Sequence, residues 1–368
     1  MLFSASRDQY RYFSKLIGHL SLPISLKHYK SLWFPELVVQ IPRDEIAEQV
    51  ELLVTRKSNT EKGQNKSALY WKIFRWLNQK RAHLLYRQYT AWLKRLDASV
   101  IGVWNGKKFR QSILVLAAQH FQKQLIFFER GPLPGYSCVD PQGVNAFSSI
   151  PRTADFYRKR DVVSANSEKS LAESENYIFV PLQVVEDSNI YLHSPWIKNM
   201  RHLYDVLEQC IKDNPALHFV LKPHPACSEQ YQDLINKHNP NIVWETQKNS
   251  TELVEKSKAV LTINSTVGIE ALMAHKKVLV LGDALYGFEP LVRLAKDQKL
   301  LQDILRDIDD LKVDEILIEQ FLDYLKTDYA IPEDAMRSPG SEHWRIMEAK
   351  LNLILNDQAE VALGLNGK

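Results

Sequence analysis

The chain has 368 residues, of which 45% are hydrophobic and 25% charged, and its formal net charge is +3. This length is too great for one ordinary core and suits two α/β domains. The composition is that of a folded globular protein, and so small a net charge does not by itself indicate a nucleic-acid partner. No segment approaches the run of about 20 apolar residues that crosses a bilayer.

The first residues and the cysteines point to the cytoplasm as the natural compartment. Residues 1–7 lack the long apolar segment and cleavage site of a secretory signal. The three cysteines, Cys138, Cys210 and Cys227, are odd in number and widely spaced. Such spacing argues against a disulfide framework and against a Cys-rich zinc site.

The N-terminal third is expected to form helices around a few short strands. Residues 51–55 make a plausible strand, and 99–104 make a better one that ends in an Asn-Gly turn signal. A helix over 109–121 and a short buried strand over 125–128 follow. This strand–helix–strand alternation predicts crossover units and a parallel sheet.

A second alternating series follows a segment, 131–175, that is rich in Pro, Gly, Ser and polar residues. Its predicted strands cover 177–180, 217–221, 242–244, 259–263 and 277–281. We therefore expect an α/β chain of two Rossmann-like domains that face each other across a cleft. The expected division is an N-terminal domain over 1–170, a C-terminal domain over 171–330 and a helical tail over 331–368.

Ligands of doubly wound sheets bind beyond the carboxyl ends of the strands, so polar residues just past each predicted strand are the candidate site. Glu129 follows the strand at 125–128, and Asp140 stands in the loop beyond it. Each carboxylate would serve as a base or nucleophile, or would orient a hydroxyl group. The alternative is that both stabilise turns, which for Asp140 is the favoured interpretation.

Two further clusters follow strands of the second series. Gln183 and Asp187 lie past the strand at 177–180, where Asp187 would either cap a helix or trap an oxocarbenium-like centre. The helix cap is the more common role. Lys222-Pro223-His224-Pro225 follows the strand at 217–221, and its two prolines hold His224 beside a lysine. That pair suits an anionic phosphate.

The fourth cluster runs from Thr262 to Ala271 and includes Asn264, Ser265, Thr266 and Glu270. Hydroxyl residues at the start of a helix form an anion site, although a plain N-cap looks the same. The Gly-rich dinucleotide pattern and the Walker loop are both absent from the sequence. Two phosphate-type sites and two carboxylate-bearing loops together indicate a nucleotide-sugar transferase.

The order of these motifs resembles that of the bacterial capsule polysaccharide biosynthesis proteins, the retaining β-Kdo transferases of capsule glycolipids and of certain O-antigen (lipopolysaccharide) termini. The resemblance covers residues 95–290 and includes a Gly-x-Ala-x-Tyr loop at 282–286. It implies a GT-B-like fold that binds CMP-Kdo, mainly through the C-terminal domain. It also implies transfer of the sugar without a metal ion.

The resemblance also implies roles for the candidate residues. Lys222, His224, Ser265 and Thr266 would contact the CMP phosphate, Glu270 would hold the ribose or the cytosine side, and Gln183 and Asn264 belong to the same donor motifs. Retention implies a sugar–carboxylate intermediate, with Asp187 as candidate nucleophile and Glu129 or Asp140 as acceptor base. The assignment among these three carboxylates stays open.

The acceptor side matches no motif. Residues 66–95 contain eight basic residues and no acidic one, interleaved with aromatic residues. This stretch would suit a membrane headgroup surface, or else a solvated basic face over a buried aromatic stripe. Two other functions remain: an inverting transferase of the CMP-sialic-acid type, and a non-catalytic CMP-sugar-binding scaffold of a capsule assembly complex. A nucleic-acid partner is the weakest alternative.

Overall fold

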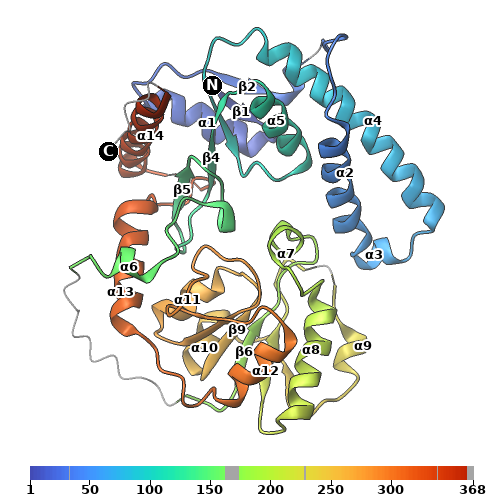
Figure 1. The fold of residues 1–368 in the computed structure, drawn as a ribbon, viewed down its shortest axis with the longest axis vertical. Coiled ribbons are helices and arrows are strands. Elements are labelled where there is room, and N and C mark those ends of the chain that lie inside the picture. The colour runs from blue at the N-terminus through green and yellow to red at the C-terminus, as the bar shows by residue number, and fades with distance from the viewer. Residues whose placement is uncertain (33, 162–173, 228, 338, 363–368) are drawn as a thin grey trace. The chain divides into compact units, whose positions relative to one another are not determined.

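The computed structural model describes residues 1–32, 34–161, 174–227, 229–337 and 339–362 (Figure 1). The chain divides into two compact units. Unit 1 comprises Met1–Thr55, Ser67–Ser149 and Tyr329–Lys368, and unit 2 comprises Arg56–Lys66 and Ile150–Asp328. The domain boundary expected near residue 170 lies outside the described residues.

Unit 2 is built on a parallel sheet of six strands. These are β6 (Ile178–Pro181), β7 (Phe219–Lys222), β8 (Ile242–Trp244), β9 (Ala259–Thr262), β10 (Lys277–Val280) and β11 (Arg293–Leu294). Their spatial order, β8-β7-β6-β9-β10-β11, is the 3-2-1-4-5-6 order of the Rossmann fold. The five strands predicted from this part of the sequence are confirmed, whereas β11, with two residues, was not predicted.

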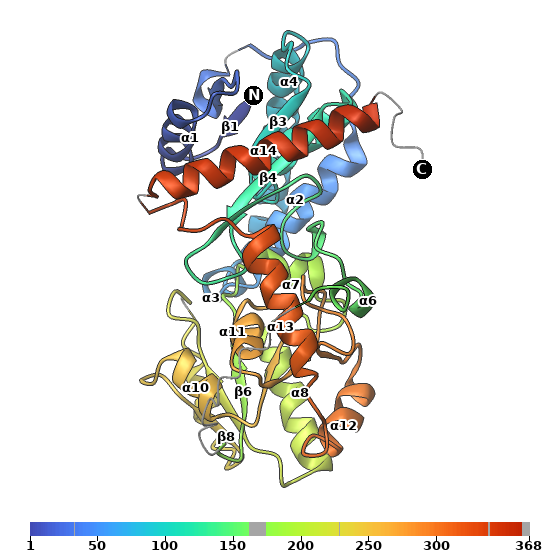
Figure 2. The same cartoon turned by 90° about the vertical axis from the view of Figure 1, so that its left-hand side faces the viewer.

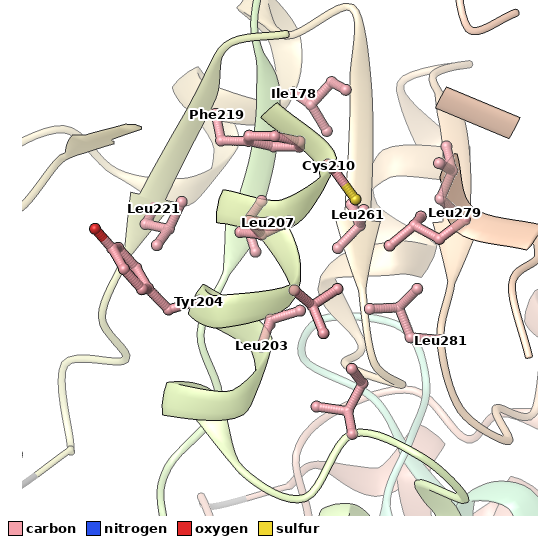
Figure 3. Close-up of a cluster of buried hydrophobic side chains, with 14 of the residues drawn as sticks. Ile178, Leu203, Tyr204, Leu207, Cys210, Phe219, Leu221, Leu261, Leu279 and Leu281 are labelled. Atoms are coloured by element: carbon pink, nitrogen blue, oxygen red, sulfur yellow. The ribbon is translucent and has the colours of Figure 1, made fainter. Parts of the chain in front are cut away.

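Helices cover both faces of this sheet (Figure 1). On one side lie α8 (Met200–Asp213) and α12 (Gln298–Arg306), and on the other α10 (Ser250–Lys256) and α11 (Val267–Met273). Figure 3 shows Leu203, Leu207 and Cys210 of α8 packed against alternate residues of the strands, among them Phe219 and Leu261. The other helices of this unit are α3 (Glu61–Gln64), α6 (Ala154–Tyr157), α7 (Ser188–His193), α9 (Gln232–Ile235) and α13 (Glu315–Tyr324).

Unit 1 is built on a second, five-stranded sheet. Its strands are β1 (Leu2–Ser4), β2 (Leu26–His28), β3 (Val100–Trp104), β4 (Gln124–Arg130) and β5 (Ser137–Asp140). The spatial order is β2-β1-β3-β4-β5, in which β1 to β4 are parallel and β5 pairs antiparallel with β4. This is the 2-1-3-4-5 order of the other common doubly wound fold. Both sheets therefore have the Rossmann-like organisation expected from the sequence.

The helices of unit 1 also form two layers. One face of the sheet packs against α2 (Arg43–Ser58), α4 (Ala68–Leu93) and α5 (Phe109–His120), and the other against α1 (Arg7–His19) and α14 (Ser341–Ala362). Short turns of 3-10 helix cover Tyr29–Ser31 and Asn145–Phe147, and a π-helical turn covers Leu325–Tyr329. None of the described helices combines the length and the apolar character that crossing a membrane needs.

The strand predicted over residues 51–55 is wrong, because these residues continue helix α2. Ile46, Val50 and Val54 recur every fourth residue and are all buried, which is the periodicity of a helix face. The local run of apolar residues, Leu52-Leu53-Val54, resembles a strand only when it is read without its flanks.

The C-terminal segment returns to unit 1 (Figure 2). Ile331 exchanges two backbone hydrogen bonds with Ser137 of β5, at 2.8 and 2.7 Å. Beyond it, Trp344 and Met347 of α14 pack into the same core as Tyr12 of α1. The described part of the predicted helical tail thus belongs to unit 1, which it joins through Ile331 and α14.

The loop after β10 packs tightly against the start of α11. Tyr286 is 1% exposed, burial raises the pKa of its hydroxyl, and that hydroxyl donates a hydrogen bond to the backbone oxygen of Ser265. A Cβ atom at Gly268 would overlap this hydroxyl group. Gly268 is therefore required by close approach, and the Gly-x-Ala-x-Tyr loop serves to hold the segment that follows β9.

We predict that Gly268→Ala lowers the free energy of unfolding by about 1–3 kcal/mol, because Tyr286 must move to admit the methyl group. Gly18→Ala is the matched control, since no atom lies within 4 Å of a Cβ at that position in α1. The control should unfold at the same temperature as the wild type or slightly higher. Thermal unfolding followed by circular dichroism distinguishes the two, and equal stability of both variants would contradict the packing argument.

Candidate functional site

The carboxyl ends of β6 and β9 form the topological switch point of unit 2. β7 and β8 lie on one side of β6, and β9 begins the series on its other side. The two strands are in register with an offset of 81 residues, as in the pair Phe179 and Val260. The same offset brings Gln183 level with Asn264 beyond the strand ends, where the two side chains hydrogen bond. Sheets of this order bind ligands at such a position.

The amide of Gln183 is oriented by its neighbours. Asn264 Nδ2 donates to the backbone oxygens of Asn189 at 3.1 Å and His193 at 3.4 Å, so Asn264 Oδ1 must face Gln183. Gln183 Nε2 then donates to Asn264 Oδ1 and to Asp187 Oδ2, both at 3.0 Å. Gln183 is only 5% exposed, and its oxygen, Oε1, is buried and has no partner among the described residues. Buried carbonyl oxygens are seldom left in this state.

Asp187 caps helix α7 and is held on both carboxylate oxygens. Oδ1 accepts from the backbone nitrogen of Asn189 at 2.9 Å, and Oδ2 accepts from Gln183 Nε2. The helix-cap interpretation is therefore confirmed. Each oxygen has a further lone pair, so capping leaves the carboxylate able to act on a ligand.

Residues from the end of α2 hold the segment on which Asp187 stands. Arg56 Nε donates to the backbone oxygen of Glu186 at 3.0 Å, and Lys57 pairs with the Glu186 carboxylate at 2.9 Å. Asn59 donates to the hydroxyl of Tyr191 at 3.3 Å. Sequence reasoning missed these contacts because about 130 residues separate their partners.

Lys222 and His224 stand at the end of β7, next to β6. Lys222 is in register with Pro181, and its backbone oxygen accepts from the nitrogen of Leu182 at 2.9 Å. His224 is exposed, and its Nδ1 accepts from the backbone nitrogen of Ala226 at 3.0 Å. A neutral imidazole that accepts at Nδ1 carries its proton on Nε2, which is then a hydrogen-bond donor.

The segment after β9 presents its hydroxyl groups unequally. Ser265 Oγ accepts from the backbone nitrogen of Val267 at 3.3 Å, which satisfies one amide at the start of α11. Thr266 occupies the cap position, is exposed and makes no capping hydrogen bond. Glu270 follows in the first turn of α11, half-buried, and this burial raises the pKa of its carboxyl group.

Glu129 lies at the carboxyl end of β4 in unit 1. Asn105 Nδ2 donates to Glu129 Oε2, and the nitrogen of Arg130 donates to Oε1 at 2.9 Å. Asn105 and Gly106 form the predicted turn after β3, with φ of 63° and 78°. Lys107 follows, 3.8 Å above the ring of Phe147, and burial lowers the pKa of its ammonium group. Asn105 and Lys107 were not predicted as site residues, since an Asn-Gly pair indicates only a turn.

Asp140 is fully buried and saturated with hydrogen bonds. Its Oδ1 accepts from the nitrogens of Gln142 at 2.7 Å and Gly143 at 3.0 Å. Its Oδ2 accepts from the nitrogen and hydroxyl of Ser149, at 2.8 and 2.9 Å, and from the hydroxyl of Tyr329 at 3.0 Å. These contacts favour the turn-stabilising role for Asp140.

The structure thus brings one group of the candidate residues together and leaves two in the other unit. Gln183, Asp187 and Asn264 are joined by hydrogen bonds, and the segments that follow β7 and β9 flank them at the same edge of the sheet. Glu129 and Asp140 belong to unit 1. Among the described residues, no three His, Cys, Asp or Glu side chains gather where they would hold a metal ion.

A protein-family model, described as capsule polysaccharide biosynthesis protein, matches residues 157–307. The FixF protein of Sinorhizobium fredii is 32% identical over 290 residues, which cover 75% of this chain and 71% of FixF. The capsule polysaccharide export protein KpsS of Escherichia coli is 26% identical over 244 residues, which cover 46% of this chain and 63% of KpsS.

Among solved structures, the β-Kdo 2,7-transferase KpsC of Thermosulfurimonas dismutans is similar with a TM-score of 0.42 and 18% identity, over 64% of this chain and 79% of that one. A likeness of this strength establishes no function. The match to FixF covers more than two thirds of both chains, and the family model spans most of unit 2. The chain therefore belongs to the capsule polysaccharide biosynthesis protein family.

Proposed function

We propose that this protein is a retaining β-Kdo transferase that moves Kdo from CMP-Kdo to a saccharide or glycolipid acceptor in capsule or O-antigen synthesis. The observation that carries the proposal is the buried oxygen of Gln183, which has no partner among the described residues and stands beside the Asp187 carboxylate at the switch point of unit 2. A glycolipid acceptor would bring the protein to the inner face of the cytoplasmic membrane.

The orientation of the Gln183 amide limits the ligand group it would meet. Both amide hydrogens are used inside the protein, so Oε1 only accepts, and the ligand must supply a hydrogen-bond donor there. Sugar hydroxyls and the cytosine amino group are such donors, whereas a fully ionised phosphate is not. A nucleotide sugar offers both kinds of group, and its phosphate would lie with Lys222, His224, Ser265 and Thr266.

The proposed reaction has two displacements at the anomeric carbon of Kdo. In the first, a carboxylate oxygen of Asp187 bonds to that carbon while the bond to the phosphate oxygen breaks, and CMP leaves with the electron pair. In the second, an acceptor hydroxyl attacks the same carbon, its proton passes to a base, and Asp187 is released as a carboxylate. Two inversions give net retention. Glu129 is the proposed base.

The roles of the other groups follow from charge. CMP leaves as a stable anion, and the Nε2 proton of His224 and the ammonium of Lys222 would stabilise the charge that develops on it. We propose that this chemistry needs no metal ion. Glu270 would accept hydrogen bonds from the ribose hydroxyls.

The first test is CMP release from CMP-Kdo generated in situ. We predict that Asp187→Asn and His224→Ala each lower release of CMP by roughly a hundredfold or more. The first removes the proposed nucleophile, and the second removes a hydrogen-bond donor to the phosphate. Asp205→Asn is the matched control, since Asp205 is an exposed carboxylate on α8. Release by the wild type should persist in EDTA.

CMP-sialic acid and a CMP-binding titration decide between this proposal and its rivals. Turnover of CMP-sialic acid with no turnover of CMP-Kdo would replace the proposal with an inverting transferase. Tight CMP binding without turnover of either donor, in the presence of acceptor saccharides, would favour the non-catalytic scaffold.

Two substitutions separate the carboxylates of unit 1. Asp140→Ala leaves buried donors unpaired, at about 1–3 kcal/mol for each orphaned group, so the unfolding temperature should fall steeply. Glu129→Gln keeps the oxygen that meets Asn105 and should leave the unfolding temperature nearly unchanged while it lowers transfer to the acceptor. A Glu129→Gln protein with full transfer activity would rule out Glu129 as the base.

Because its pKa is raised, the carboxyl group of Glu270 is expected to destabilise the folded state in a pH-dependent way. A carboxyl group whose pKa is higher in the folded state than in the unfolded chain favours folding while it is protonated, and that contribution is lost as pH rises through the folded-state pKa. Glu270→Gln should therefore match the wild type at low pH and unfold at a higher temperature near neutral pH. The same variant should bind CMP more weakly by calorimetry; unchanged CMP affinity would remove Glu270 from the donor site.

A further inference from the structure

The outward face of helix α4 carries an apolar stripe that the core does not use. Leu69, Ile73, Trp76, Leu77 and Leu84 follow one another at helical spacing and are each about half exposed or more, with Leu69 at 65% and Trp76 at 59%. At 100° per residue these positions fall within an arc of about 100°. They form one continuous stripe, and α4 runs along the outer edge of its unit (Figure 1).

The opposite face of α4 already packs in the core of unit 1. Ala82, Tyr86, Tyr89 and Leu93 are buried against residues of α2, α5 and the sheet. The aromatic residues of the basic stretch thus divide into two sets: Tyr86 and Tyr89 belong to the core, and Trp76 faces solvent. A helix anchored by one face has no structural need for a second apolar face.

The charges on and beside this stripe are all positive. Lys72 and Lys80 are exposed and form no ion pair with any described residue, and Lys80 Nζ lies 5.9 Å from the centroid of the Trp76 ring. Two carboxylates of neighbouring segments are already used, because Glu51 pairs with Arg75 and Glu36 pairs with Lys94. The face therefore combines apolar side chains with uncompensated positive charge.

A neighbouring loop extends the apolar surface. Arg87, on the same side of α4, accepts at its backbone oxygen from the nitrogen of Glu36 at 3.0 Å and donates from its guanidinium to the backbone oxygen of Leu37 at 3.0 Å. Leu37 and Val38, held in this way, are 76% and 85% exposed. Exposed apolar side chains thus continue beyond the end of the stripe.

We propose that this face, the stripe of α4 with Lys72, Lys80 and the loop that carries Leu37 and Val38, binds the surface of an anionic lipid bilayer, with α4 lying parallel to it. An interfacial helix of this kind inserts Trp, Leu and Ile among the acyl chains and keeps its lysines among the headgroups. A second copy of the chain is a poorer occupant, because a two-fold interface would bring the same lysines together. A nucleic acid is also a poorer occupant, because its charged phosphates would lie against the leucine side chains.

The inference extends the proposed function, because a glycolipid acceptor is reached at a lipid surface, but lipid binding alone tests it. The stripe lies on unit 1, and the donor residues lie on unit 2. CMP release from soluble CMP-Kdo is therefore a separate readout, and loss of one property leaves the other measurable.

The experiment is flotation of the full-length protein with vesicles of phosphatidylcholine, with and without about one-third phosphatidylglycerol. The test variant is Ile73→Ser/Trp76→Ser. The control is Ile316→Ser/Leu353→Ser, which removes two apolar side chains that are 70% and 61% exposed on other helices. Wild type and control should float with the anionic vesicles, and the test variant should bind them at least about tenfold more weakly. Lys72→Gln/Lys80→Gln should also weaken that binding.

Three outcomes would overturn the proposal. One is equal flotation of the test variant and the wild type, with unfolding temperatures that show both to be folded. Another is wild-type binding that is equally strong to vesicles with and without phosphatidylglycerol, which would show that lipid charge plays no part. The third is a wild-type dimer in the absence of vesicles that the test variant abolishes, which would make this face an interface between two copies of the chain.

Discussion

The hydrogen-bonded link of Asp187, Gln183 and Asn264 is the constraint on which the candidate site depends. It joins the loop after β6 to the loop after β9, and Asn264 extends it to the backbone of α7 through Asn189 and His193. Every donor in the link has only one arrangement that satisfies its neighbours. The amide nitrogens of Gln183 and Asn264 both donate to carbonyl or carboxylate oxygens. Gln183 Oε1 is therefore left without a donor among the described residues.

The same link explains why the surrounding loops are so closely packed. Short helices such as α7 have little stability of their own, so their position depends on tertiary contacts. The nitrogen of Asp283 donates to the backbone oxygen of His193 at 2.7 Å, and a Cβ at Gly282 would lie 2.5 Å from that oxygen. Arg56 and Lys57 hold the other end of the loop through Glu186. Asp187 is thus fixed from three directions, and such preorganisation is what its proposed role as nucleophile requires.

The sequence predicts the second sheet better than the first, for physical reasons. The strands from β6 to β10 are apolar runs separated by helices, a pattern that only a parallel sheet explains well. β1 and β2 have three residues each, too few for any periodicity to appear. The candidate residues of unit 2 were found because they follow strands, but the pairing of Gln183 with Asn264 depends on register across 81 residues. No local sequence pattern predicts a contact between residues that are so far apart in the chain.

Glu129 and Asp140 were both candidates because they follow the strand predicted over 125–128, yet the direction of β5 separates them. β5 runs antiparallel to β4, so its last residue, Asp140, lies level with Phe127 inside the sheet, while Glu129 is two residues nearer the carboxyl edge. The rule that ligands bind beyond carboxyl ends holds for parallel strands, and it therefore applies to Glu129 and fails for Asp140. Asp140 instead meets five donors that draw its loop and Tyr329 together. Strand direction, which the sequence does not reveal, thus separates a candidate base from a structural carboxylate.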